Sequence, residues 1–146
     1  MATVKEKPSL TIVRKLKAAP DKVWRALTHP EALKKWMAPD DAFKFPVAET
    51  DVRVGGRYHI VMISPDGEDH DVSGSYRVIV PNRKLVYTWA WKSTPERESL
   101  VTFELRAADG GTELTLKHEQ FADEEARDKH QQGWIGCLAR LEKALA

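Results

Sequence analysis

The distribution of apolar side chains divides the chain into a short first strand, a helical stretch, a long region with a period of two, and a helical end. Residues 9–17 alternate roughly between apolar and polar side chains, which predicts a half-buried strand. Two short apolar runs with helical spacing follow, one beginning at Pro20 and the next at Pro30 and ending at Pro39. Because proline suits the first turn of a helix but not its interior, we expect two short helices rather than one long one.

Between residues 40 and 120 the apolar positions recur with the period of β-strands. Residues 40–46 look irregular, and we expect strands over 47–54, 58–63, 72–80, 85–91, 101–106 and 114–119. Turn sequences such as Ser64–Gly67 and Asp109–Gly111 separate the strands, so neighbouring strands must run antiparallel. A sheet of six or seven such strands twists and curls, and its apolar inner face needs a cover.

Residues 123–146 form a segment long enough to provide that cover. Its helical wheel has an apolar stripe that consists of Trp134, Leu138, Leu141 and Leu145. Asp123 is placed to cap the N-terminus of the helix. We therefore predict an α+β protein, a single domain over residues 1–146. In it a curved antiparallel sheet of six to seven strands wraps around a long C-terminal helix, with two short helices after the first strand.

The inner face of the sheet and the first half of the long helix hold the candidate binding residues. Arg127 and His130 lie on the stripe upstream of Trp134, where a polar group would orient a ligand in an otherwise apolar pocket. The alternative is a histidine bonded to backbone and an arginine that reaches solvent. The inner aromatic side chains either line a cavity or fill the core completely. The predicted ligand-binding residues are Trp36, Tyr58, Met62, Tyr76, Trp89, Phe103, Arg127, His130 and Trp134.

No catalytic or metal-binding motif accompanies these residues. The run Glu68–Asp71 follows a Pro-Asp-Gly turn, so we interpret it as a solvated hairpin tip rather than a metal cluster. His118, on the last predicted strand, is expected near His130, but two histidines without a placed carboxylate do not define a metal site. The sequence has no Gly-x-Ser-x-Gly turn and no glycine loop for phosphate or a dinucleotide. We therefore predict no metal, no cofactor and no assigned catalytic residue.

Composition narrows the classes of partner. The chain has 23 Lys and Arg against 22 Asp and Glu, a formal net charge of +1, which gives no basis for nucleic-acid binding. It lacks the roughly 18 consecutive apolar residues of a membrane span and shows no signal-peptide core. Its single cysteine, Cys137, lies beside the apolar stripe and is interpreted as a small buried hydrophobe. We expect a cytoplasmic monomer or weak homodimer without nucleic-acid binding or membrane insertion.

Several short motifs, in this order and spacing, resemble those of a known family. They are Ala19-Pro20, Val23-Trp24, Pro30-Glu31, Val54-Gly55-Gly56, Gly74-x-Tyr76, Leu85-Val86-x-Thr88-Trp89, Gly111-Thr112 and Gly133-Trp134. Together they resemble the family named after the activator of the heat-shock-protein-90 ATPase. That family belongs to the START-like (SRPBCC) superfamily, and the resemblance implies its helix-grip fold. One departure is Val78, at a position where relatives often carry a glutamate.

The resemblance leaves three functions open, because members of this superfamily bind lipids or hormones, cyclise polyketides or assist a chaperone. The first is the binding of an apolar or amphipathic small molecule between sheet and helix. The second is a co-chaperone role on a heat-shock ATPase, as part of a stress response. The third is an enzyme of the cyclase or hydrolase kind, for which His130 or His118 would be the acid or base.

Overall fold

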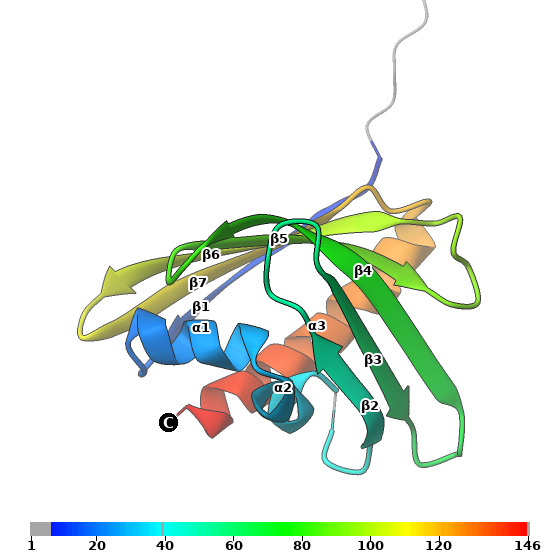
Figure 1. Cartoon of the computed structure of the whole chain (residues 1–146), viewed down its shortest axis with the longest axis horizontal. Helices are drawn as coiled ribbons and strands as arrows, with labels where there is room; N and C mark the ends of the chain where they lie inside the picture. The colour runs from blue at the N-terminus through cyan, green and yellow to red at the C-terminus, as the bar shows by residue number, and fades with distance from the viewer. Residues whose placement is uncertain (1–6, 39, 146) are drawn as a thin grey trace, which may run out of the picture.

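The computed structural model describes residues 7–38 and 40–145, which form one seven-stranded antiparallel sheet and three helices (Figure 1). The elements in chain order are β1 (Leu10–Leu16), α1 (Pro20–Thr28), α2 (Pro30–Trp36), β2 (Lys44–Thr50), β3 (Arg57–Ile63), β4 (Asp69–Val80), β5 (Lys84–Trp91), β6 (Ser99–Ala108), β7 (Gly111–Glu119) and α3 (Glu124–Ala144). The predicted helix-grip architecture is confirmed. Pro39, expected to end the second helix, lies outside the described residues.

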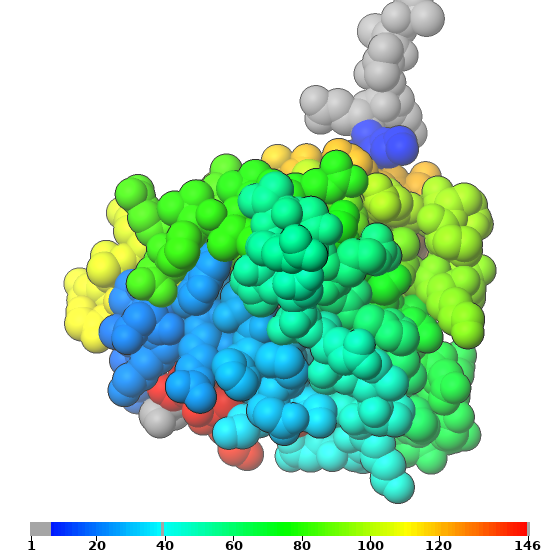
Figure 2. All heavy atoms as spheres, in the orientation of Figure 1, coloured from blue at the N-terminus to red at the C-terminus, as the bar shows by residue number. Residues whose placement is uncertain are grey.

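The strand order β1-β7-β6-β5-β4-β3-β2 follows from two simple connections. After β1, the helices α1 and α2 carry the chain to the opposite edge of the sheet, and a meander of hairpins then returns it to β7 beside β1. The sheet curves strongly, and α3 crosses its concave side (Figure 1). Helix α2 packs against both α3 and β2, and its atoms lie directly against those of β2 in the space-filling view (Figure 2).

The apolar stripe of α3 closes the core, as the helical wheel predicts. Leu138 and Leu141 are completely buried, and Trp134 is nearly so. The carboxylate of Asp123 accepts a hydrogen bond of 2.8 Å from the backbone N–H of Ala126 and so caps the helix. The inner sheet positions are buried at every second residue, which confirms the expected face of the sheet.

Several strand boundaries predicted from the sequence are wrong; β6 and β7 begin at Ser99 and Gly111 rather than at residues 101 and 114, and two further errors change the interpretation. The strand expected over 47–54 is β2, Lys44–Thr50, so residues 44–46 are extended rather than irregular. The period of two misleads beyond residue 50, because Val52 and Val54 are exposed in the connection between β2 and β3. Pro46 is tolerated inside β2 since this strand lies at the edge of the sheet.

The second wrong boundary changes the surroundings of a histidine. Strand β4 begins at Asp69 and not at Val72, so only residues 64–68 form the hairpin tip. His70 pairs with Met62 of β3, lies on the same side of its strand as Val72, and is half-buried rather than solvated. The charged residues around it obscure the strand period in the sequence.

The core contact of α3 is tested by shortening one leucine. We expect Leu138→Ala to lower the free energy of unfolding by about 2–5 kcal/mol, because it leaves a cavity in a fully buried site. Ile135 on the same helix is 39% exposed, and Ile135→Ala should change the free energy by no more than about 0.5 kcal/mol. Urea unfolding followed by circular dichroism measures both, and equal effects of the two substitutions would contradict this packing.

Candidate functional site

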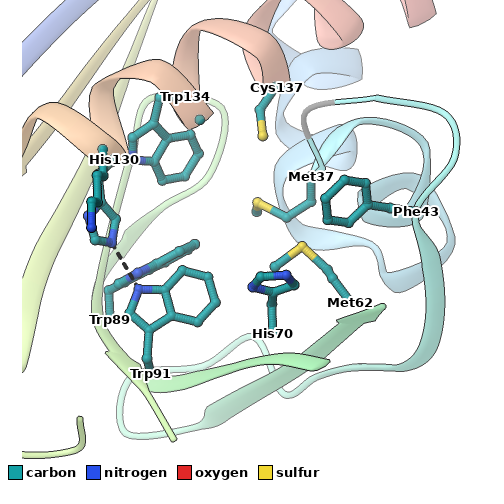
Figure 3. A pocket seen from close by; sticks show the side chains of 11 residues that line it. Met37, Phe43, Met62, His70, Trp89, Trp91, His130, Trp134 and Cys137 are labelled. Atoms are coloured by element: carbon teal, nitrogen blue, oxygen red, sulfur yellow. Dashed lines mark hydrogen bonds between the residues drawn. The ribbon is translucent and has the colours of Figure 1, made fainter. Parts of the chain in front are cut away.

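A pocket of about 430 Å³ lies between α3 and the open end of the sheet (Figure 3). From α3 it is lined by Lys129, His130, Gly133, Trp134 and Cys137. From the sheet it is lined by Met62 of β3, His70 of β4, and Trp89 and Trp91 of β5. Met37, just after α2, and Phe43, just before β2, complete the wall. Indole rings, thioethers and a thiol therefore provide most of the lining.

The helical and strand periods bring these side chains to one place. Gly133 and Trp134 follow His130 by three and four residues along α3, so all three face the same side of the helix. Trp89 and Trp91 are two residues apart on β5, so both point to the concave side of the sheet. Their rings meet edge to face, with centroids 5.4 Å apart.

A hydrogen bond between β5 and α3 forms one wall of the pocket. The indole Nε1 of Trp91 donates to Nε2 of His130 over 2.9 Å (Figure 3). The other ring nitrogen, Nδ1 of His130, lies 2.7 Å from the carbonyl oxygen of Ala126 and donates to it. Because Nε2 accepts and Nδ1 donates, this arrangement requires the neutral imidazole with its proton on Nδ1.

A second indole–imidazole hydrogen bond lies deeper in the core. Nε1 of Trp134 donates to Nδ1 of His118 over 2.9 Å, so His118 carries its proton on Nε2. That nitrogen lies 2.7 Å from Oγ of Ser99, which in turn donates to the carbonyl oxygen of Trp89. The proximity of His118 and His130 expected from the sequence is confirmed, with ring centroids 5.2 Å apart.

The tautomer of His118 bears on the enzyme hypothesis. A general base must present an unprotonated nitrogen to the hydroxyl that it activates. Here Nε2 of His118 donates to Ser99 while Nδ1 is occupied by Trp134. The Ser99–His118 pair therefore resembles a nucleophile and its base only in distance, since the proton lies on the wrong nitrogen.

Burial favours the neutral forms of His118, His130 and Cys137. Burial, and then the neighbouring His130, holds the pKa of His118 well below its usual value. Burial also lowers the pKa of His130, although the hydrogen bond to Ala126 opposes this shift. Burial raises the pKa of the Cys137 thiol to about 12, so the thiol is not a nucleophile at neutral pH.

Four of the residues predicted to bind a ligand line this pocket, and five do not. Met62, Trp89, His130 and Trp134 lie in its wall. Arg127 points away, since its guanidinium pairs with Asp128 at 2.8 Å and also contacts the carbonyl oxygen of Ser9.

The other four predicted residues fill the core beside α2. Trp36 packs edge to face on Phe103 and donates from Nε1 to the carbonyl oxygen of Ala26. Tyr58 and Tyr76 have ring centroids 5.8 Å apart, and the hydroxyl of Tyr58 donates to the carbonyl oxygen of Thr88. These rings pack on one another, and Trp36 and Tyr58 donate hydrogen bonds to backbone carbonyl oxygens. The pocket lies outside this group of side chains.

Sequence reasoning missed several lining residues for identifiable reasons. His70 and Trp91 share the strand parity of inner residues, which is the signal that could have found them. Met37 and Phe43 lie outside regular elements, so no period marks them. Gly133 does not mark a close approach of α3 to the sheet, because a Cβ atom built there meets no atom within 4 Å. The glycine therefore faces open space in the pocket wall.

The described part of the chain contains no group of three or more His, Cys, Asp or Glu side chains arranged to hold a metal ion. Within the same residues, none of the helices is both long enough and apolar enough to cross a membrane.

Comparison with known proteins identifies the family. The family model described as Activator of Hsp90 ATPase homolog 1-like protein matches residues 17–146. The human protein named Activator of 90 kDa heat shock protein ATPase homolog 1 is 28% identical over 127 residues, and its mouse counterpart is 27% identical. The match covers 86% of this chain but 33% of the human protein, so the chain spans about a third of these relatives.

Solved structures show the same fold. Protein CV1439 of Chromobacterium violaceum superimposes with a TM-score of 0.85 at 28% identity, covering 94% of this chain and 96% of that one. The AHSA1 protein SPO3351 of Silicibacter pomeroyi gives a TM-score of 0.82 at 26% identity, covering 94% and 97%.

The buried His118 and the half-buried His130 predict a pH dependence of stability. Both have pKa values lowered by folding, so the unfolded chain binds their protons more readily. The contribution of the two histidines to the free energy of unfolding should be fully present above pH of about 6.5, the ordinary pKa of histidine. Below that pH the free energy of unfolding should fall, by up to about 1.4 kcal/mol per pH unit for each histidine. Urea unfolding between pH 7.5 and 5 measures this slope.

The substitution His130→Gln provides the matched control for this slope. A glutamine amide can accept from Trp91 but does not titrate, so the slope below pH of about 6.5 should become shallower. A slope that is absent in the wild type, or identical in the variant, would contradict the neutral hydrogen-bonded state of His130.

Proposed function

The chain belongs to the family of Activator of Hsp90 ATPase homolog 1-like proteins, and on that basis we propose that it binds an apolar or amphipathic small molecule in the pocket beneath Trp134. The pocket volume of about 430 Å³ falls within the roughly 300–1,000 Å³ that ligand pockets span. Its lining of indoles and thioethers favours a flat apolar group, and His130 and His70 add a polar edge.

Gly133 is the observation that carries this proposal. A glycine in the interior of a helix lowers its stability by about 1 kcal/mol relative to alanine. Such a glycine is usually explained by a close approach of neighbouring atoms or by a positive φ angle. Neither applies at Gly133, because a Cβ atom there meets nothing within 4 Å and the residue is helical. The missing side chain instead leaves pocket volume that a larger residue would fill.

The location of this function is part of the proposal. A lone cysteine excludes an internal disulfide, which suits the reducing cytoplasm. We propose that the protein acts there, and that it does so as a monomer or weak homodimer.

Filling the pocket from Gly133 is the direct test. The probe is 2-methoxynaphthalene, a flat apolar ring system, and calorimetric titration measures its Kd. We expect Gly133→Leu to weaken binding at least tenfold. In thermal unfolding without probe, the variant should be no less stable than the wild type, because leucine is the better helix former.

The control places the same side chain one residue away. Gln132 is exposed on α3, so Gln132→Leu should leave the Kd within twofold. If the wild type does not bind the probe or other flat apolar compounds, small-molecule binding in this pocket is excluded.

A second candidate function is supported by the curated relatives. The human and mouse proteins that match are named as activators of the 90 kDa heat-shock-protein ATPase. Because this chain corresponds to about a third of their length, action on such a chaperone is a proposal for this chain.

This second function has an independent assay. The ATPase rate of the heat-shock-protein-90 chaperone from the same organism is measured with and without an excess of the chain. A co-chaperone should raise the rate at least twofold, and an unrelated protein of similar size should not. An unchanged rate at saturating concentration would argue against a chaperone role.

A further inference from the structure

A second, smaller pocket lies on the other side of the Trp91–His130 hydrogen bond. Its volume is about 280 Å³. It shares Trp89, Trp91, Lys129 and His130 with the first pocket, so the two cavities have a common wall. That wall consists of side chains from β5 and α3, joined by the 2.9 Å bond from Trp91 Nε1 to His130 Nε2.

The two pockets differ in chemistry. Beyond the common wall, the lining of the second pocket includes the polar residues Thr94, Arg97 and Ser99, as well as Phe121 and Ala126. The first pocket is mainly indole and sulfur. Together they offer an apolar end and a hydrogen-bonding end, which is the pattern that an amphipathic ligand requires.

The charges around the second pocket balance one another. Arg97 lies 3.8 Å from Asp123, and Lys129 lies 3.2 Å from Glu125. All four of these residues line the pocket. Since each cation has an acidic partner, the site has no net charge to attract an ion, and an uncharged polar group fits it better.

The chemistry of the common wall selects a hydroxyl group. Trp91 offers a donor and His130 an acceptor, and in the free protein they satisfy each other. A hydroxyl inserted between them can accept from the indole and donate to the imidazole, so both groups stay bonded. A carboxylate or ether oxygen accepts only, and an ammonium donates only, so each would leave one side unsatisfied.

The wall also contains a buried donor that is unused. Nε1 of Trp89 is enclosed and has no hydrogen-bond partner among residues 7–38 and 40–145. The Trp89 ring neighbours both members of the bond, with centroids 5.4 Å from Trp91 and 6.4 Å from His130. A buried N–H without an acceptor is rare, and this one belongs to the ring that neighbours both members of the bond.

We infer that the two pockets form one binding site for an elongated, uncharged amphipathic molecule, one of whose hydroxyl groups replaces the Trp91–His130 hydrogen bond. This inference rests on the small-molecule binding proposed above. The apolar end of the ligand lies beneath Trp134, and its polar end lies beside Thr94 and Ser99.

Two compounds with the same carbon skeleton test the inference. The first is 3-(2-naphthyloxy)propane-1,2-diol, and the second is 2-propoxynaphthalene, which lacks both hydroxyls. Calorimetric titration of the full chain should give a Kd for the diol at least tenfold lower than for the propyl ether. Hydrophobicity alone favours the opposite order.

A variant locates the effect in the second pocket. Ala126 lines only that pocket, so Ala126→Leu should reduce the ratio of the two Kd values to about one. Ala139→Leu makes the same change at an exposed position of α3 that lines neither pocket, and it should retain the wild-type ratio.

The two proposals fail in different ways. If 2-methoxynaphthalene binds but the diol binds no more tightly than the propyl ether, the joined site is overturned and the proposed function stands. If none of the three naphthalene compounds binds the wild type, small-molecule binding is excluded and the joined site with it.

Discussion

A straight helix can follow a curved sheet closely over only part of its length, and this constraint explains the arrangement of the site. Around Leu138 and Leu141 the contact is complete, because these side chains are fully enclosed by the core. Upstream, the sheet curves away and small apolar side chains no longer span the space. There the contact is made by hydrogen bonds between large rings, from Trp134 to His118 and from Trp91 to His130. Such ring-to-ring bridges hold helix and sheet together while leaving volume between them.

The two bridges depend on neutral histidines, and they determine what kind of molecule the site can accept. Each imidazole accepts a hydrogen bond from an indole N–H on one nitrogen and donates a hydrogen bond from the other, so a second proton on the ring would break the bond to the indole. Burial lowers both pKa values and keeps this state at neutral pH. A site held by neutral donors and acceptors stabilises uncharged polar groups, because the charged side chains that line its second pocket are already paired with one another and do not offset the desolvation of an ion.

The sequence was sufficient for the fold but only partly sufficient for the site. The period of two, the turn residues and the stripe on α3 each report a repeated local preference, so the sheet, the three helices and their packing could be predicted. The site depends on which inner side chains fill the core and which leave space. Trp36 lies on the buried face of helix α2 and Trp89 on the inner face of strand β5, yet Trp36 fills the core and Trp89 borders a cavity. That difference arises from the tertiary placement of α2 and from sheet curvature, which no local pattern encodes.

The central claim is that the space beneath Trp134 receives an apolar ligand. The most direct measurement is a crystal structure of the protein soaked with 2-bromonaphthalene, with diffraction recorded at the bromine absorption edge. This account predicts one strong anomalous peak inside the pocket bordered by Met62, Trp89 and Trp134, with the naphthalene ring against the indoles. Bromine density confined to the protein surface, with this pocket unchanged, would contradict it.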